Sequence, residues 1–97
     1  MLHELKTLPI SFEAVVNGEK TFEFRKNDRG FCVGDKLLLR EWDEFLNAYT
    51  NRCALVNVTY VFLGTTFPSF PVGYVIMSIS APLGLSGVRN QDNLDQF

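Results

Sequence analysis

The stretch CALVNVTYVFL, residues 53–63, is a long run of β-branched and aromatic residues and predicts a β-strand. A strand with a nearly continuous apolar centre, KLLLRE at residues 36–41, precedes it, and GYVIMSI at residues 73–79 follows it. Residues 42–51 are expected to form a hairpin-like excursion, and residues 64–71, rich in Thr, Phe and Pro, a loop. Strands joined by short connections therefore form the predicted centre of the fold.

The residues before this centre predict a short strand and one helix. Residues 3–8 alternate loosely, as in a short strand. Within residues 11–17, Phe12, Val15 and Val16 share one face at helical spacing, and an Asn-Gly pair follows. We expect a helix of about two turns with this stripe toward the core.

Residues 21–25, TFEFR, alternate strictly between apolar and polar side chains. This period of two predicts a half-buried strand. We expect Phe22 and Phe24 on its core face, with Glu23 and Arg25 on the other face.

One early helix followed by four or five strands indicates a mainly β fold with one or two short helices. Because no second helix is available to cross between parallel strands, we expect a small antiparallel β-barrel with the helix plugging one end. Residues 1–81 are expected to form this single domain. Residues 82–97 have no steady period and are expected to be a flexible tail or an interaction arm.

Composition excludes several classes of protein. A chain of 97 residues with 46% hydrophobic residues can bury a core, which excludes disorder throughout. A net charge of -2 excludes a polybasic protein that holds nucleic acid by bulk charge. No apolar run approaches the roughly 20 residues that span a bilayer, and the N-terminus lacks the plan of a signal peptide. A soluble, cytoplasmic protein without a membrane partner is expected.

Cysteine and histidine are too few for a zinc site. Cys32, Cys53 and His3 cannot supply four ligands, and a reducing compartment predicts two free, partly buried thiols. We expect no metal and no other cofactor. His3 has no partner pattern that would indicate a catalytic triad.

The segment GEKTFEFR, residues 18–25, carries the densest functional signal. A glycine allows a tight turn, and Lys20, Glu23 and Arg25 follow at spacings that place them around one opening. A guanidinium beside a carboxylate offers a donor fork and an acceptor, which suits the edge of a nucleobase or a phosphate. The alternative is a surface ion pair worth roughly 0 to 1 kcal/mol.

The pattern Gly18-x-Lys20-x-x-Glu23-x-Arg25 resembles the signature of ASCH domains in the PUA-like superfamily, and its surroundings resemble the DUF3850 branch. The resemblance covers about residues 1–80 and rests on further blocks in the same order: HELK (3–6), FEAVVNG (12–18), RKNDR (25–29), VGD (33–35), LREWD (39–43) and GYVIMSI (73–79). It implies a PUA-like barrel with a cleft beside the first helix. It also implies a general association with RNA or modified nucleosides.

The resemblance also implies a second hypothesis, because some members of the superfamily are small amidohydrolases. In that case the chain would act on an acylated cytidine nucleoside. These enzymes look to use the motif lysine, a threonine three residues later and a glutamate on a late strand. Lys20 matches the lysine, but Glu23 stands at the threonine position, and no Asp or Glu occurs between residues 50 and 85. The catalytic residues of this alternative are Lys20 and Glu23.

The binding hypothesis rests on local charge. Between residues 18 and 40, six basic residues stand against four acidic ones, and this is the only positively charged segment. RNA or a nucleoside ligand is expected to bind the three motif residues with support from two further arginines: Lys20, Glu23, Arg25, Arg29 and Arg40. A patch of this size binds weakly alone, so stacking on aromatic rings is needed.

The nearest aromatic residues outside the predicted core are Trp42 and Tyr49. Trp42 follows a strand at a turn, where it serves either as a ligand contact or as a cap on the core. Phe67, Phe70 and Tyr74 either line the mouth of a cleft or pack under the proline-rich loop. A third hypothesis is an accessory protein that binds another protein through residues 82–97.

Overall fold

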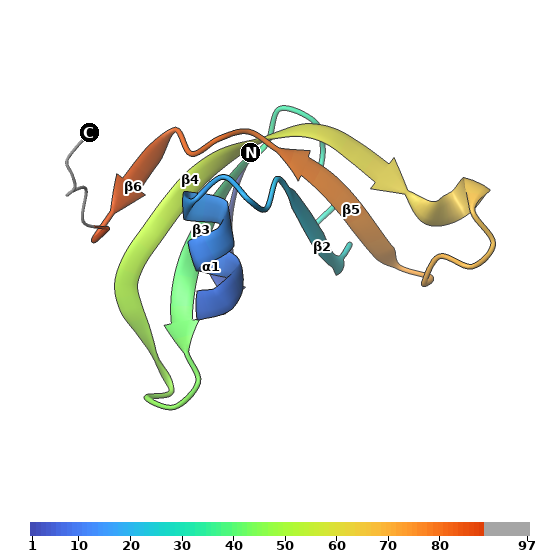
Figure 1. Cartoon of the computed structure of the whole chain (residues 1–97). Helices are drawn as coiled ribbons and strands as arrows, with labels where there is room; N and C mark the ends of the chain where they lie inside the picture. Colours follow the sequence, from blue (N-terminus) through green and yellow to red (C-terminus); the bar gives the residue numbers. More distant parts are fainter. Residues whose placement is uncertain (89–97) are drawn as a thin grey trace.

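A computed structural model describes residues 1–88 and is mainly β with one short α-helix, as the sequence predicts. Figure 1 shows its elements. They are β1 (Leu2–Thr7), α1 (Pro9–Val16), β2 (Phe22–Lys26), β3 (Lys36–Asp43), β4 (Ala48–Leu63), the 3-10 turn η1 (Gly64–Thr66), β5 (Tyr74–Ile79) and β6 (Gly84–Ser86).

The long strand β4 organises the sheet. Its first part pairs antiparallel with β3 and its last part with β5, in the order β1-β3-β4-β5-β2. Register shifts occur between Arg40 and Trp42 and between Val58 and Tyr60, and such bulges bend a strand. The sheet therefore arches, with β4 running along the arch and α1 on its concave side (Figure 1).

The described strands form an open sheet, not the closed barrel that the sequence predicts. β1 and β2 are the two ends of the strand order. The β1–β3 pair is parallel, because residues 8–35 supply the long crossover that a parallel pair needs. Two arginine side chains, one in β2 and one in the turn after it, bind the unpaired edge of β1. Arg25 Nη2 donates to the Lys6 carbonyl at 2.9 Å, and Arg29 Nη1 donates to the Glu4 carbonyl at 2.7 Å.

The helix buries the face that its sequence predicts. Phe12 and Val15 are fully buried, and Val16 packs partly against the core. Pro9 occupies the first turn, where its missing N–H costs nothing. The remaining core comes from β1, the three central strands and one residue before β3: Leu5, Phe31, Leu37, Leu39, Ala54, Val56, Val58, Val75, Met77 and Ile79.

The faces of β2 are the reverse of the sequence prediction. Phe22 and Phe24 are 45% and 48% exposed, whereas Glu23 is 2% exposed. The register explains this reversal, because Glu23 lies opposite Met77 on the inner face of β5. Strict alternation defines two faces without saying which one meets the core.

The C-terminal segment begins with a strand. Leu85 pairs with Ala54 in the β4–β6 ladder, and the Leu83 amide donates to the Leu55 carbonyl at 2.7 Å. The start of the segment predicted as a flexible tail, residues 82–97, is therefore tied to the sheet. Its last part, residues 89–97, lies outside the described residues.

Candidate functional site

The Glu23 carboxylate is the centre of a charged group between β1 and β2. Its side chain is 3% exposed, and both of its oxygens are bound: Oε2 by Lys20 Nζ at 2.5 Å and Oε1 by Arg25 Nε at 2.9 Å. A buried carboxylate requires such partners. Two cations share one anion, so this Glu23 cluster (Lys20, Glu23 and Arg25) carries a net positive charge.

The turn after α1 places Lys20 in the cluster. Gly18 has φ +78°, a left-handed conformation in which glycine costs least. The amides of Glu19 and Lys20 both donate to the Ala14 carbonyl, at 2.8 and 3.0 Å. The helix end is thereby closed, and Lys20 reaches the start of β2.

Arg25 connects the cluster to β1. Its Nε binds Glu23, while its Nη2 donates to the Lys6 carbonyl and, at 3.3 Å, to the Thr7 hydroxyl. The planar guanidinium can make these bonds together because its donors diverge in one plane. Thr7 is a buried site residue that the sequence did not single out.

A cleft of about 510 Å³ opens beside the Glu23 cluster. Residues of β1, the start of α1, β2 and β5 line it. Its charged residues are four cations and one anion: Lys6, Lys20, Arg25, Lys26 and Glu23. The cleft is therefore positive although the whole chain has a net charge of -2.

Aromatic rings form the outer wall of this cleft. Phe24 stacks on Tyr74 with ring centres 5.2 Å apart and an interplanar angle of 19°. Lys20 Nζ lies 5.1 Å from the centre of the Phe22 ring. All three rings are partly exposed and line the cleft. The sequence prediction missed Phe22 and Phe24 as site residues because it assigned them to the core.

The structure places the other predicted site residues away from the cleft. Arg29 binds the free edge of β1 next to Arg25 but does not line the cleft. Arg40 lies on the outer face of β3, with its guanidinium carbon 3.9 Å from the centre of the Tyr49 ring. Trp42 shares that face and meets Tyr49 edge-on at 4.9 Å.

Lys6 lies between the cleft and the outer face of β3. It lines the cleft, and its Nζ lies 3.9 Å from the centre of the Trp42 ring. Trp42 is half-buried and neither caps the core nor lines the cleft. Of the six residues predicted to bind the ligand, Lys20, Glu23 and Arg25 therefore line the cleft, whereas Arg40 and Trp42 meet at Tyr49 on the outer face of β3.

A second cavity, of about 490 Å³, lies under the segment that joins β4 to β5. Phe67, Phe70 and Tyr74 are among its lining residues, and Phe70 also packs edge-on against Phe62. Its walls are mostly apolar, with Asn27 and Thr65 as polar members. Tyr74 lines both cavities.

Two other buried charge groups are structural. Arg52 donates to both oxygens of Glu41 at 2.8 and 2.7 Å, and these hydrogen bonds lower the pKa of Glu41. His3 Nε2 lies 2.9 Å from Asp35 Oδ2, and this hydrogen bond is the main reason that the pKa of Asp35 falls from 3.8 to about 2. Neither group lines either cavity. The His3–Asp35 hydrogen bond connects β1 to the start of β3.

The two residues that the amidohydrolase hypothesis names, Lys20 and Glu23, bind each other at the cleft. Within residues 1–88, Glu23 is the one carboxylate that lines the cleft, and it is bound on both oxygens. Lys20 Nζ donates to that carboxylate, so the two residues form an ion pair. The same residues contain no group of three or more His, Cys, Asp or Glu arranged to hold a metal. Cys32 and Cys53 are free thiols, Cys32 exposed and Cys53 half-buried.

None of the helices in residues 1–88 combines the length and the hydropathy that a membrane crossing requires.

Comparison with known proteins identifies the family. A protein of Escherichia phage P2, "Uncharacterized 12.9 kDa protein in GpA 3'region", is 38% identical over 60 residues. The match covers 62% of this chain and 53% of the phage protein, so the chain spans about half the length of that relative. The family described as "Domain of unknown function (DUF3850)" matches residues 2–79, from β1 through β5 and including the whole Glu23 cluster. The chain belongs to the DUF3850 family.

Proposed function

We propose that the cleft beside the Glu23 cluster binds a nucleobase-containing ligand, either RNA or a modified nucleoside. The observation that carries this proposal is the pairing of two features in one cleft. A buried carboxylate flanked by Lys20 and Arg25 lies next to the exposed Phe24–Tyr74 ring stack. The first feature supplies cationic donors for a base edge or a phosphate, and the second supplies planes for stacking.

The charge of the cleft supports the same ligand class. Four cations against one carboxylate attract phosphate and raise the local concentration of a polyanion. The affinity gained from charge is limited. With about three phosphate contacts, an increase in salt from 50 to 200 mM lowers the affinity only on the order of tenfold. Stacking, worth about 1 to 3 kcal/mol per base, must supply the rest.

The size of the cleft is also suitable. Ligand sites measure roughly 300 to 1,000 Å³, and the cleft measures about 510 Å³. Its hydroxyl groups, Thr7 and Ser11 at one wall and Tyr74 at the other, add neutral hydrogen-bonding partners. Apolar rings combined with positioned polar groups are typical of sites that fix the orientation of a ligand.

The resemblance of residues 18–25 to the ASCH signature supports this proposal independently. The PUA-like superfamily is associated with RNA and modified nucleosides, and the residues of the signature are the ones that form the Glu23 cluster here. We therefore propose an ASCH-type, PUA-like relationship for this chain together with its ligand class.

The test compares two phenylalanines. Phe24→Ala removes the ring that stacks on Tyr74, whereas Phe45→Ala removes a fully exposed ring at the tip of the β3–β4 hairpin. Binding of a labelled single-stranded RNA octamer is measured by fluorescence anisotropy at 50 mM salt, and binding of a nucleoside panel by calorimetry. We expect about tenfold weaker binding for Phe24→Ala and no change for Phe45→Ala.

A second pair of variants tests the charges. Lys20→Gln should weaken binding of the same probes, whereas Lys36→Gln, an exposed lysine at the start of β3, should not. The proposal fails if the wild-type protein binds neither RNA nor any nucleoside at 50 mM salt. It also fails if Phe24→Ala and Phe45→Ala have the same affinity while both show the wild-type circular dichroism spectrum.

A further inference from the structure

The two cavities of the molecule meet at one residue. Tyr74 lines both the cleft and the cavity under the β4–β5 connection. The strand β2 also leads from one to the other, since Lys26 lines the cleft and the next residue, Asn27, lines the second cavity. The two spaces are therefore neighbours along a continuous wall.

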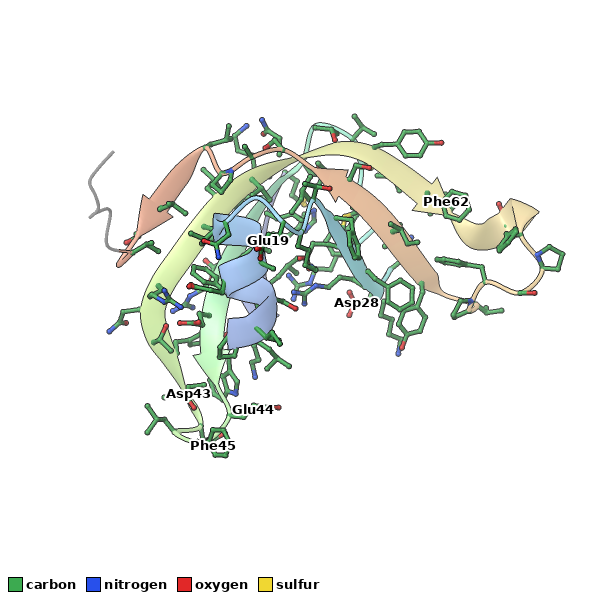
Figure 2. The ribbon with its side chains drawn as sticks, viewed as in Figure 1. Glu19, Asp28, Asp43, Glu44, Phe45 and Phe62 are labelled. Carbon is green, nitrogen blue, oxygen red and sulfur yellow. The ribbon has the colours of Figure 1, made fainter. Side chains whose placement is uncertain are left out.

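Aromatic rings follow this wall in a series. The Phe24 ring stacks on Tyr74 and meets the edge of Phe70 at 5.9 Å between centres. Phe70 in turn meets Phe62 at 5.5 Å. Figure 2 shows Phe62 on the β4–β5 arm close to η1, far from Phe45 at the opposite hairpin tip. An aromatic surface thus extends from the charged cleft into the second cavity.

A cation lies at the junction of the two cavities. Lys26 is exposed and is the register partner of Tyr74 in the β2–β5 ladder. Within residues 1–88, no carboxylate lies within ion-pair distance of its ammonium group. An unpaired ammonium between two aromatic-lined spaces fits a phosphate that joins two stacked bases.

The chemistry of the two cavities differs in a way that suits consecutive nucleotides. The cleft is positive and offers hydrogen-bonding groups for a base edge. The second cavity is mostly apolar, and its rings Phe67 and Phe70 offer faces for a base with little hydrogen bonding. Their volumes, about 510 and 490 Å³, are nearly equal.

We propose that the two cavities are adjacent base sites for one single-stranded oligonucleotide, with Lys26 binding the phosphate between the two bases. This inference rests on the proposed function and narrows it. The preferred ligand is a strand of at least two nucleotides, not a free nucleoside.

The test is a series of ligands of increasing length. The four nucleosides, their 3′-monophosphates and the four homodinucleotides are titrated by calorimetry at 50 mM salt. We expect affinity to rise at each step, with at least one dinucleotide about tenfold tighter than its 3′-monophosphate, because the second base then stacks in the second cavity.

Two variants test which residues provide the affinity gained with the second base. Phe67→Ala removes an exposed ring from the second cavity and should abolish the gain from the second base while leaving nucleoside binding unchanged. Lys26→Gln should weaken dinucleotide binding by several-fold, and should weaken nucleoside binding less, because a nucleoside carries no phosphate. Phe45→Ala and Lys36→Gln are the matched controls and should change neither.

Failure of this inference differs from failure of the proposed function. Equal affinities for 3′-monophosphates and dinucleotides overturn the two-site proposal and leave the cleft as a single-base site. The two-site proposal is also overturned if Phe67→Ala still binds dinucleotides more tightly than 3′-monophosphates by the wild-type factor. The absence of binding by every ligand in the series overturns both proposals.

Discussion

Two buried glutamates of this protein have similar partners and different surroundings. Glu41 is 3% exposed and Glu23 is 2% exposed, and each is held by an arginine. The Glu41 carboxylate binds Arg52 and Thr50, and it lines neither cavity. The Glu23 carboxylate binds Lys20 and Arg25 and lines a cleft of about 510 Å³.

The difference lies in what the arginine does beyond the ion pair. Arg52 packs over Phe12, 5.0 Å from its ring centre, and reaches Glu13, so it joins β4 to β3 and α1. Arg25 instead joins two strand ends that have no ladder between them. The Glu41–Arg52 pair, which joins β3, β4 and α1, stabilises the fold. The Glu23 cluster lies where β1 and β2 have no ladder between them, and its cations are available to a ligand. The following experiments test this distinction.

Removing Arg52 should have the largest effect on stability. Arg52→Ala leaves the buried Glu41 without its main partner, and we expect a loss of about 2 to 3 kcal/mol, reduced from the fully buried case because Arg52 is partly exposed. The measurement is urea unfolding. Glu13→Gln, which removes the exposed partner of the same arginine, should cost less than about 0.5 kcal/mol. A loss for Arg52→Ala as small as that for Glu13→Gln would contradict a structural role.

Neutralising Glu23 should lower both the stability of the fold and the affinity for RNA. In Glu23→Gln the carboxylate charge between Lys20 and Arg25 is lost, but both cations keep some contact with water. We expect a stability loss of about 1 to 2 kcal/mol and roughly tenfold weaker RNA binding, since the variant mispositions both cations. Unchanged RNA affinity in a folded Glu23→Gln protein would show that the cluster is structural, like that of Glu41.

Asp35 provides a pH-dependent comparison. Its pKa is lowered from 3.8 to about 2 in the folded protein by the hydrogen bonds from His3 and the Cys32 amide. Its stabilising contribution is therefore complete above about pH 4 and is lost as the pH falls toward 2. Urea midpoints between pH 5 and 2 should fall less steeply in Asp35→Asn than in the wild type. A control, Asp28→Asn on an exposed turn, should keep the wild-type slope, and an equally steep fall in Asp35→Asn would disprove this assignment.

The smallest effect is expected on the outer face of β3. Arg40 makes a long, exposed contact with Glu4 at 3.4 Å and lies 3.9 Å from the centre of the Tyr49 ring, so Arg40→Gln should lower the free energy of unfolding by at most about 1 kcal/mol. RNA affinity should not change, because Arg40 lies outside the cleft. Weaker RNA binding in this variant, measured by anisotropy, would move the binding surface to the outer face.

Local patterns in the sequence predicted the elements well. The helix stripe of Phe12 and Val15 and the strands at residues 36–41 and 73–79 lie close to their predicted positions, because side-chain periodicity is a local property. The spacing of Lys20, Glu23 and Arg25 also placed them in one cluster, since a single turn and one strand face determine their positions.

Properties that depend on strand pairing were not accessible from the sequence. The exposed face of β2 follows from its pairing with β5, and alternation alone cannot distinguish the two faces. The β1–β3 pair is parallel because residues 8–35 act as a crossover, and the sheet is open because no ladder joins β1 to β2 among the described residues. Neither pairing can be read from a local pattern. Arg40 and Trp42 were grouped with the site by charge and proximity in sequence, but β3 directs them to the outer face of the sheet.

The most direct test is an amide chemical-shift titration of the labelled protein with a short single-stranded RNA at 50 mM salt. Binding in the cleft predicts that the largest shifts occur in β2, residues Phe22–Lys26, and at Tyr74, with little change from Arg40 to Tyr49. The largest shifts on the outer face of β3, or no shifts at millimolar RNA, would contradict the account.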